Sequence, residues 1–448
     1  MLNGRTTPGI FRWLRWLAPG MKVKRWLLLA LAGGFLFLNG FGRLLSGHNF
    51  YFQINGYIDR QLVARDGISV VTIEWVFIAV GLVLVYFGIR QWMRSIVSAV
   101  SPKGEQQLVD RVYERRQLDR GYRIVAIGGG TGLSSLLRGL KEYTTNLTAI
   151  VTVADDGGSS GRLRHELGVL PPGDIRNCLV ALADSESMMT DLFEYRFNEG
   201  DGLTGHSFGN LFLAAMSGIA GDFDSAIKES SRVLNIKGRV LPSTLANVAL
   251  EATLEDGTVV LGESNISKSK SPIRSIRLVP ESCEPLDEAI EAILAADAIV
   301  LGPGSLYTSV MPNLLVPGIA EAVERSMALK VYVCNIMTQP GETDGLSAAD
   351  HARALLNGTG KMLFDHVLVN IEQPQRLLKR YESDGAYPVK ADLERLTELR
   401  LGPVTGNFVS ETQLVRHDPQ HLAQSVMHLV LERVQGPGLI QELSPATT

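Results

Sequence analysis

Two long apolar runs stand near the start of the chain, the first from Trp26 to Gly42 and the second from Ile68 to Ile89. The first run carries no charged residue, and the second carries only Glu74. Each approaches the roughly 20 apolar residues that cross the hydrocarbon core of a bilayer. The pattern predicts two transmembrane helices, at about 26–42 and 68–89, within a membrane anchor of residues 1–103.

Basic residues crowd before the first run and after the second, whereas the loop between the runs holds fewer. Because Lys and Arg stay on the cytoplasmic side of a membrane protein, we expect both termini and the large remaining part of the chain in the cytoplasm. A cleaved signal peptide is disfavoured, since Asn39–Arg43 is a poor cleavage site and a second apolar run follows. The expected location is the cell (plasma) membrane, with two spans.

The pattern changes after a charged segment, residues 104–121, whose apolar positions recur at helical spacing and predict a linker helix. Beyond it, short apolar runs lead into polar loops that contain glycine, and several of these loops lead into helical patterns. This alternation is typical of an α/β domain with a mostly parallel sheet and helices on both faces. The predicted strands of this kind are Tyr122–Ile127, Ala149–Ala154, Asp297–Leu301 and Lys330–Ile336.

A different pattern interrupts this domain. The stretch Val248–Glu263 alternates between apolar and polar residues around Glu255-Asp256-Gly257-Thr258, which is a strong hairpin signal. Together with Ile273–Val279, this stretch predicts an antiparallel insertion at about 248–280.

Composition and charge narrow the range of partners. The formal net charge of −4 over 448 residues gives no basic excess that would suit a nucleic acid. The three cysteines lie far apart and show none of the paired spacings of a zinc site. We therefore expect no nucleic-acid partner and no structural zinc. The large domain covers residues 122–434, and the tail, residues 435–448, is predicted to be disordered.

A glycine-rich loop follows the first predicted strand of the domain. Glycine lets the backbone approach a phosphate closely, and the free amides of a helix start donate to its oxygens. The Gly-x-Gly-x-Gly spacing differs from the Gly-x-Gly-x-x-Gly dinucleotide fingerprint, which disfavours bound NAD. A purely structural tight turn is the alternative. The predicted ligand-binding residues of this loop are Gly128, Gly129, Gly130, Thr131 and Gly132.

Two adjacent acids, Asp155 and Asp156, follow the second predicted strand and precede a loop of small residues that ends at Arg162. Three roles are open for them: they hold a divalent cation such as Mg²⁺, accept hydrogen bonds from a ribose, or cap a turn and its helix. The small residues and the arginine beside the acids favour a ligand role over capping.

Further polar residues stand where helical patterns begin. Asp174 and Asn177 open one helix, and His206 and Asn210 open another, where an anion would meet free amides. A structural role is the alternative for each. Because ligands bind beyond the carboxyl ends of parallel strands, we expect these residues to converge with the loop after the strand 297–301. The predicted ligand-binding residues of that loop are Gly302, Gly304, Ser305, Tyr307 and Thr308.

Three common catalytic motifs do not occur in the sequence: there is no serine-hydrolase elbow, zinc-protease helix or P-loop.

Five motifs in order resemble the gluconeogenesis factor family, which belongs to the 2-phospho-L-lactate transferase superfamily. They are VAIGGGTGLSSLLRGLK, VTVADDGGSSGRLRHELGVLPPGDIRNCLVALA, GLTGHSFGNLFLAAM, GPGSLYTSVMPNLLVPGI and NIMTQPGETDGLSAADH. The resemblance spans about Tyr122 to Val434 and implies a Rossmann-like core with an inserted subdomain. The chain departs from the family at its front, where most members begin directly at the first strand.

The resemblance also implies a function. Members of the family bind a UDP-linked amino sugar and are needed for cell shape and envelope synthesis during growth on gluconeogenic carbon. On that basis we predict a membrane-tethered regulator that binds a nucleotide sugar of the UDP-GlcNAc type. Near the C-terminal end, Tyr381 and Arg416 resemble family segments, and they would stack on the uracil and pair with the diphosphate. Envelope-synthesis proteins and a second copy of the chain stay open as partners.

The alternative is an active enzyme. The transferase branch of the superfamily moves a phospholactyl group from a nucleotide diphosphate donor with a divalent cation. In that case Asp155 and Asp156 would be the catalytic residues and would hold Mg²⁺. Paired acids beside phosphate loops suit this chemistry, but they also suit binding alone.

Overall fold

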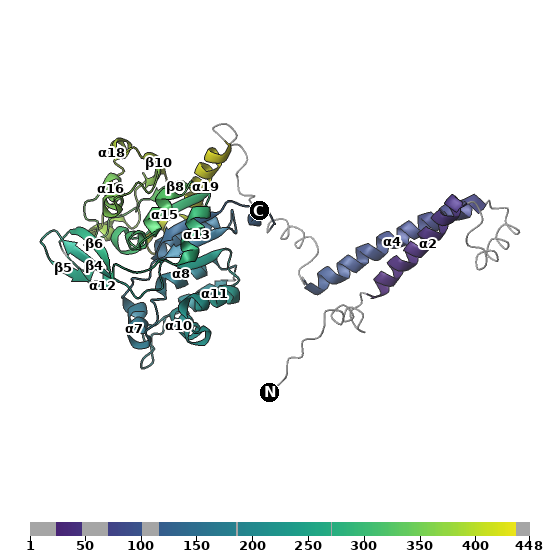
Figure 1. Ribbon diagram of the computed structural model, residues 1–448, viewed down its shortest axis with the longest axis horizontal. Helices are drawn as coiled ribbons and strands as arrows, with labels where there is room; N and C mark the ends of the chain where they lie inside the picture. Colours follow the sequence, from purple (N-terminus) through teal and green to yellow (C-terminus); the bar gives the residue numbers. More distant parts are fainter. Residues whose placement is uncertain (1–23, 47–69, 101–115, 185–186, 270, 436–448) are drawn as a thin grey trace. The chain divides into compact units, whose positions relative to one another are not determined.

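The computed structural model describes residues 24–46, 70–100, 116–184, 187–269 and 271–435 (Figure 1). These residues belong to two compact units, one within residues 1–115 and one within residues 116–448. Most of the predicted linker helix, up to Arg115, lies outside the described residues, as does the predicted tail from Gly436 onward.

The described part of the first unit contains two helices, α2 (Lys24–Ser46) and α4 (Val70–Val100). Each contains a stretch that is long and apolar enough to cross a membrane, Arg25–Gly42 in α2 and Glu74–Ser95 in α4. The prediction of two apolar helices ahead of the α/β domain is therefore confirmed. Their insertion into a bilayer stays a prediction.

The two helices pack along a seam of glycines. A Cβ built on Gly33 would lie 2.7 Å from the backbone nitrogen of Val85, and one built on Gly81 would lie 2.6 Å from that of Phe37. No atom would lie within 4 Å of a Cβ on the neighbouring Gly34. Because small residues let apolar helices approach closely, the spacing of these glycines defines the face by which α2 and α4 meet.

The second unit is built around a seven-stranded sheet in which each pair of neighbouring strands is parallel. The strand order is β10-β9-β8-β7-β1-β2-β3, so the direction of travel reverses between β1 and β7. This confirms the predicted α/β fold with a mostly parallel sheet. The strands are β1 (Ile124–Gly128), β2 (Leu147–Val151), β3 (Arg239–Pro242), β7 (Ala298–Leu301), β8 (Leu329–Val333), β9 (His366–Asn370) and β10 (Gly402–Gly406).

The central strands are continuous apolar runs because helices cover both faces of the sheet. Every residue of β1, β2 and β7 is buried. The helices fall into two groups, since α6 packs on α8 and α19 whereas α13 packs on α15. Strand–helix–strand connections are right-handed, so those that run in opposite directions from β1 place their helices on opposite faces of the sheet. The helices are α6 (Gly130–Leu140), α7 (Gly158–Leu167), α8 (Gly173–Leu182), α9 (Ser187–Glu194), α10 (Phe208–Ala220), α11 (Phe223–Leu234), α12 (Glu263–Ile266), α13 (Asp287–Ala295), η2 (Leu306–Val310), α14 (Met311–Leu314), α15 (Ile319–Arg325), α16 (Ala348–Thr359), α17 (Leu378–Ser383), α18 (Leu393–Glu398) and α19 (Pro419–Gln435).

An antiparallel insertion separates β3 from β7, as predicted. Its strands β4 (Ala249–Leu254), β5 (Val259–Leu261) and β6 (Ile273–Val279) pair in the order β5-β4-β6. The inward positions of β4 alternate with half-buried ones, which explains the period of two in the sequence. The short helix α12 follows β5. A second antiparallel pair, β11 (Val409–Glu411) with β12 (Val415–His417), lies near the C-terminus.

Candidate functional site

The reversal in strand order puts the ends of β1 and β7 side by side. In an open parallel sheet, a crevice forms beyond the strand ends at such a point. We call the two loops that follow these strands, residues 129–132 and 302–305, the switch-point loops. The buried Asn313 donates hydrogen bonds to the carbonyl oxygens of Gly128 (2.9 Å) and Ser309 (2.8 Å) and so joins the end of β1 to the segment after β7.

The glycine loop leads into α6, whose N-cap residue Gly129 offers no side-chain hydrogen bond. Part of the need for glycine comes from packing within the protein. A Cβ on Gly129 would lie 2.4 Å from Asp174 Oδ2, and one on Gly132 would lie 2.6 Å from the carbonyl oxygen of Pro303. The glycines therefore have a structural role, and because the close approach that they permit leaves helix amides near the crevice, the ligand-binding interpretation stays a prediction.

Asp174 lies at the start of α8 and accepts a hydrogen bond from the backbone of Gly130. Burial and the nearby carboxylate of Asp155 raise the pKa of Asp174 to about 7. Burial also raises the pKa of Asp155, even though the backbone nitrogen of Gly157 donates to it at 2.8 Å. Both side chains keep partial contact with solvent. The two acids are therefore packed in protein on most sides and still reachable by a ligand.

The adjacent acids Asp155 and Asp156 have different partners. Asp156 Oδ1 accepts a hydrogen bond from the backbone nitrogen of Ser264 (2.8 Å), at the start of α12 in the insertion. Within the described ranges, no group of three His, Cys, Asp or Glu side chains is placed to hold a metal ion. Mg²⁺ at this pair stays a prediction, and the protein itself would supply few of its ligands.

Two further acids, Glu263 and Glu342, face the same region, although no sequence pattern distinguishes them. Burial and the carboxylates of Asp155 and Asp174 raise the pKa of Glu263 to about 9. Glu342 is buried, and its Oε1 accepts hydrogen bonds from Ser267 and Thr308 at 3.1 and 3.3 Å. Its Oε2 is buried and has no hydrogen-bond partner among the described residues.

Residues at the start of α10 face the helix that follows the acids. His206 Nδ1 lies 2.9 Å from Ser159 Oγ, and Asn210 Nδ2 donates to the same oxygen at 3.0 Å. Burial and the positive charge of Arg162 lower the pKa of His206, so its ring is neutral at pH 7. Both predicted ligand residues thus hold Ser159 in place. The free amide that an anion would have met is capped instead, because Ser207 accepts from the backbone of Asn210.

The first turn of α8 contacts the start of α10. Arg176 Nη1 donates to Ser207 Oγ at 2.5 Å, and its Nη2 donates to Asn177 Oδ1 at 2.6 Å. Asn177, a predicted ligand residue, therefore orients this arginine. The contact with the start of α10 accounts for the position of the Arg176 cation in the first turn of α8, where a positive charge is otherwise disfavoured.

The loop after β7 supplies hydroxyl groups to the crevice. Ser305 Oγ accepts a hydrogen bond from Gln339 Nε2 at 2.8 Å, while Thr308 bonds Glu342. Tyr307 is half-buried on η2. A Cβ on Gly304 would lie 3.4 Å from the carbonyl oxygen of Gly129, which shows how closely the switch-point loops approach one another. Gly302, the first residue of the loop after β7, has a positive φ of 80°.

The two C-terminal predictions lie on connected elements. Tyr381 Oη accepts a hydrogen bond from the backbone of Val415 at 3.0 Å, which ties α17 to β12. Strand β12 packs on α6, and His417 Nε2 lies 3.1 Å from the carbonyl oxygen of Cys334, just beyond β8. The side chain of Arg416, between these contacts, is exposed. Both residues therefore lie at the end of the sheet where the switch-point loops emerge.

Comparisons with known proteins agree with this geometry. Residues 124–409 match the family model described as 2-phospho-L-lactate transferase CofD. The gluconeogenesis factor of Bacillus subtilis is 52% identical over 312 residues, which cover 69% of this chain and 98% of that protein. The chain belongs to the gluconeogenesis factor family, within the 2-phospho-L-lactate transferase superfamily.

Two further relatives extend the comparison, one in sequence and one in structure. A Nostoc sp. protein named "Putative gluconeogenesis factor" is 48% identical over 95% of this chain and 94% of its own length, so its match reaches into the first unit. A crystal structure of a UPF0052 family member from Bacillus halodurans superposes with a TM-score of 0.66 and 50% identity, covering 68% of this chain and 99% of that one.

Proposed function

We propose that the second unit binds a nucleotide sugar of the UDP-GlcNAc type at the switch-point loops and acts as a regulator in gluconeogenic growth. The observation that carries the proposal is the start of α6, which follows a glycine loop at the reversal of strand order: Asp174 accepts from Gly130, and the amides of Thr131 and Gly132 have no side-chain partner among the described residues. Helix amides in such a place bind phosphate oxygens. The name of the family supports a role in gluconeogenesis.

The nucleoside end of this ligand would lie toward β12. An exposed guanidinium pairs with a diphosphate in bidentate fashion, which is the role proposed for Arg416. The aromatic ring of Tyr381 offers a face for the uracil, while its hydroxyl is held by Val415. The proposal extends to control of cell shape and envelope synthesis, which draw on amino-sugar nucleotides, and envelope-synthesis proteins would be the partners.

We also propose that α2 and α4 tether the protein to the cell membrane, with the second unit in the cytoplasm. The length and apolar character of both helices support this. Carbonate extraction of membranes tests it: the full chain should stay in the pellet, while a chain beginning at Arg116 should be released. Release of the full chain without detergent would refute the tether.

Thermal melting tests the nucleotide-sugar proposal. At about 100 times the Kd, a ligand that binds only the folded state adds about 2.7 kcal/mol to the free energy of unfolding. Saturating UDP-GlcNAc should therefore raise the melting temperature of the wild type and raise that of Arg416→Ala less. An unchanged melting temperature in the wild type would instead support a scaffold that holds no ligand.

One observation favours an enzyme as the second candidate. Asp155, Asp174 and Glu263 have raised pKa values and lie together at the end of the sheet, as acid and base groups of active sites do. Incubation with nucleotide diphosphate donors and Mg²⁺, with release of nucleoside monophosphate as the signal, distinguishes the two. Sustained release that Asp155→Asn abolishes would establish turnover, whereas binding without release supports the regulator.

A further inference from the structure

A second cavity, of about 440 Å³, lies outside the switch-point loops. One wall is strand β6 of the insertion, the opposite wall is α16, and η2 and α14 line it between them. A volume of this size is within the range of small-molecule pockets, which are largely apolar with a few placed polar groups.

The lining combines apolar and cationic side chains. Ile276, Met311 and Leu346 supply apolar surface, and Arg274 and Arg353 supply two guanidinium groups. Among the described residues, Arg274 takes part in no ion pair, and its side chain is exposed toward solvent. The cavity thus offers two positive groups beside an apolar wall.

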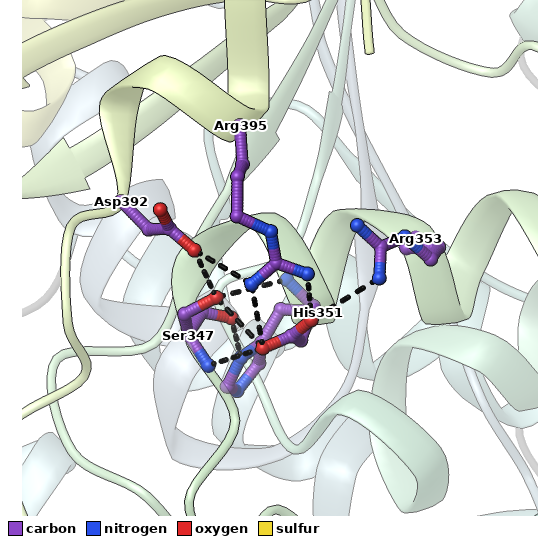
Figure 2. Close-up of polar contacts among 6 residues, drawn as sticks. Ser347, His351, Arg353, Asp392 and Arg395 are labelled. Atoms are coloured by element: carbon purple, nitrogen blue, oxygen red, sulfur yellow. Dashed lines mark hydrogen bonds and ion pairs between the residues drawn. The ribbon is translucent and has the colours of Figure 1, made fainter. Parts of the chain in front are cut away.

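The acid that lines the cavity, Asp350, has its closest partners on α18 and at the start of α16, and Figure 2 draws the contacts of Arg395 and Ser347 in this cluster. Arg395 Nη2 donates to Asp350 Oδ1 at 2.8 Å, while the backbone nitrogen of Ser347 donates to Oδ2 at 3.1 Å. Arg395 also bonds Asp392 at 2.8 Å. By contrast, Arg353 approaches Asp350 only to 3.5 Å. Because Arg353 meets Asp350 with one nitrogen only, the other donors of its guanidinium have no hydrogen-bond partner among the described residues and are left for an anion.

We propose that this cavity binds a small organic anion. Arg274 and Arg353 hold its phosphate or carboxylate group, and a short aromatic or aliphatic body lies on Met311 and Leu346. Guanidinium groups suit both kinds of anion because their donors match two oxygens at once. This inference goes beyond the proposed function, since it concerns a separate cavity with a different ligand.

The cavity shares one residue with the main site. Tyr307 lines it and also stands just after the switch-point loop 302–305. The next residue, Thr308, bonds Glu342 in the crevice. An anion in the cavity therefore contacts the segment that lines the nucleotide-sugar site, and we expect each ligand to change the affinity for the other by the same factor.

Equilibrium dialysis with phenyl phosphate as the probe tests the proposal. The full chain is held in nanodiscs, with empty nanodiscs as the blank and benzyl alcohol as the uncharged analogue. We expect saturable binding of phenyl phosphate that Arg353→Gln or Arg274→Gln weakens about tenfold, the loss typical of one charge-assisted hydrogen bond. Arg325→Gln, an exposed arginine on α15 outside the cavity, is the matched control and should bind like the wild type.

Two results would overturn the proposal. One is the absence of saturable uptake, and the other is uptake that neither Arg274→Gln nor Arg353→Gln changes. In the second case the probe binds elsewhere on the chain. The test is read without any nucleotide sugar present, so failure of the proposed function would leave its outcome unaffected. Both arginines are solvent-accessible, so neither substitution threatens folding.

Discussion

The carboxylate of Asp174 lies against the backbone of Gly129, so closely that a Cβ on this glycine would stand 2.4 Å from Oδ2. The same carboxylate accepts a hydrogen bond from the next residue, Gly130. The start of α8 is thereby fixed to the start of α6 at the reversal of strand order. Any ligand phosphate bound by α6 would lie beside this acid.

Replacing Gly129 with alanine should disturb this contact. We expect Gly129→Ala to lower the free energy of unfolding by about 1–3 kcal/mol, the usual effect of overpacking, and to weaken ligand binding. The control is Gly218→Ala on α10, where no atom lies within 4 Å of the new Cβ and alanine favours the helix by about 1 kcal/mol. Urea unfolding measures both. Equal midpoints for Gly129→Ala and the wild type would contradict the close packing.

Asp174 makes stability depend on pH. Its pKa is about 7 in the folded chain against a usual value of 3.8, so between about pH 4 and pH 7 the folded state keeps a proton that the unfolded state has lost. The wild type therefore loses stability as pH rises through this window. Asp174→Asn has no such proton and still accepts from Gly130.

The stability gained by Asp174→Asn over the wild type should thus grow from pH 5 to pH 8. We expect a difference on the order of 1–3 kcal/mol, at 1.4 kcal/mol per unit of pKa shift reduced by the partial solvent contact of the side chain. Chemical unfolding at the two pH values measures it. A constant difference across the window would show that the pKa of Asp174 is not raised.

The fold and the position of the glycine loop could be predicted because their signals are local. Buried parallel strands are continuous apolar runs, and the glycines after β1 follow directly in sequence. The acids Glu263 and Glu342 could not be selected, because each is a single carboxylate in a polar loop far from Asp155 along the chain. The contacts of Ser264 with Asp156 and of Ser267 with Glu342 bring the insertion over the strand ends.

The same limit applies to two predicted ligand residues that share a partner elsewhere in the chain. His206 and Asn210 both contact Ser159, which precedes them by 47 and 51 positions. A sequence pattern shows that polar groups stand at helix starts, but it does not show which of them face one another. A role of either residue toward a ligand would therefore act through Ser159 and the helix that follows the acids.

Asn313 offers a test of how the strand ends are joined. Asn313→Ala removes two hydrogen bonds and a fully buried side chain, although the carbonyl oxygen of Gly128 keeps the hydrogen bond from the backbone of Thr152, and should lower the free energy of unfolding by about 2–4 kcal/mol. Asn198→Ala, at an exposed position, should change it by less than about 0.5 kcal/mol. Guanidinium unfolding compares the two. Similar midpoints would mean that Asn313 does not join the loops.

Substitutions at two adjacent glycines of α2, Gly33 and Gly34, test the glycine seam of the first unit. Gly33→Ile should separate α2 from α4, because its Cβ would meet the backbone of Val85, whereas Gly34→Ile should be tolerated. Titration of the detergent-solubilised full chain with SDS, followed by the fluorescence of Trp75 and the other tryptophans, all of which precede residue 116, reports the contact. We expect Gly33→Ile alone to lower the SDS midpoint, and equal midpoints in both variants would refute the seam.

Calorimetric titration of the full chain in nanodiscs with UDP-GlcNAc measures whether the switch-point loops bind a nucleotide sugar. We expect saturable binding of one ligand per chain, weakened about tenfold by Arg416→Ala through the loss of a charge-assisted contact. Absence of saturable heat up to millimolar ligand, or binding that Arg416→Ala and Gly129→Ala leave unchanged, would contradict it.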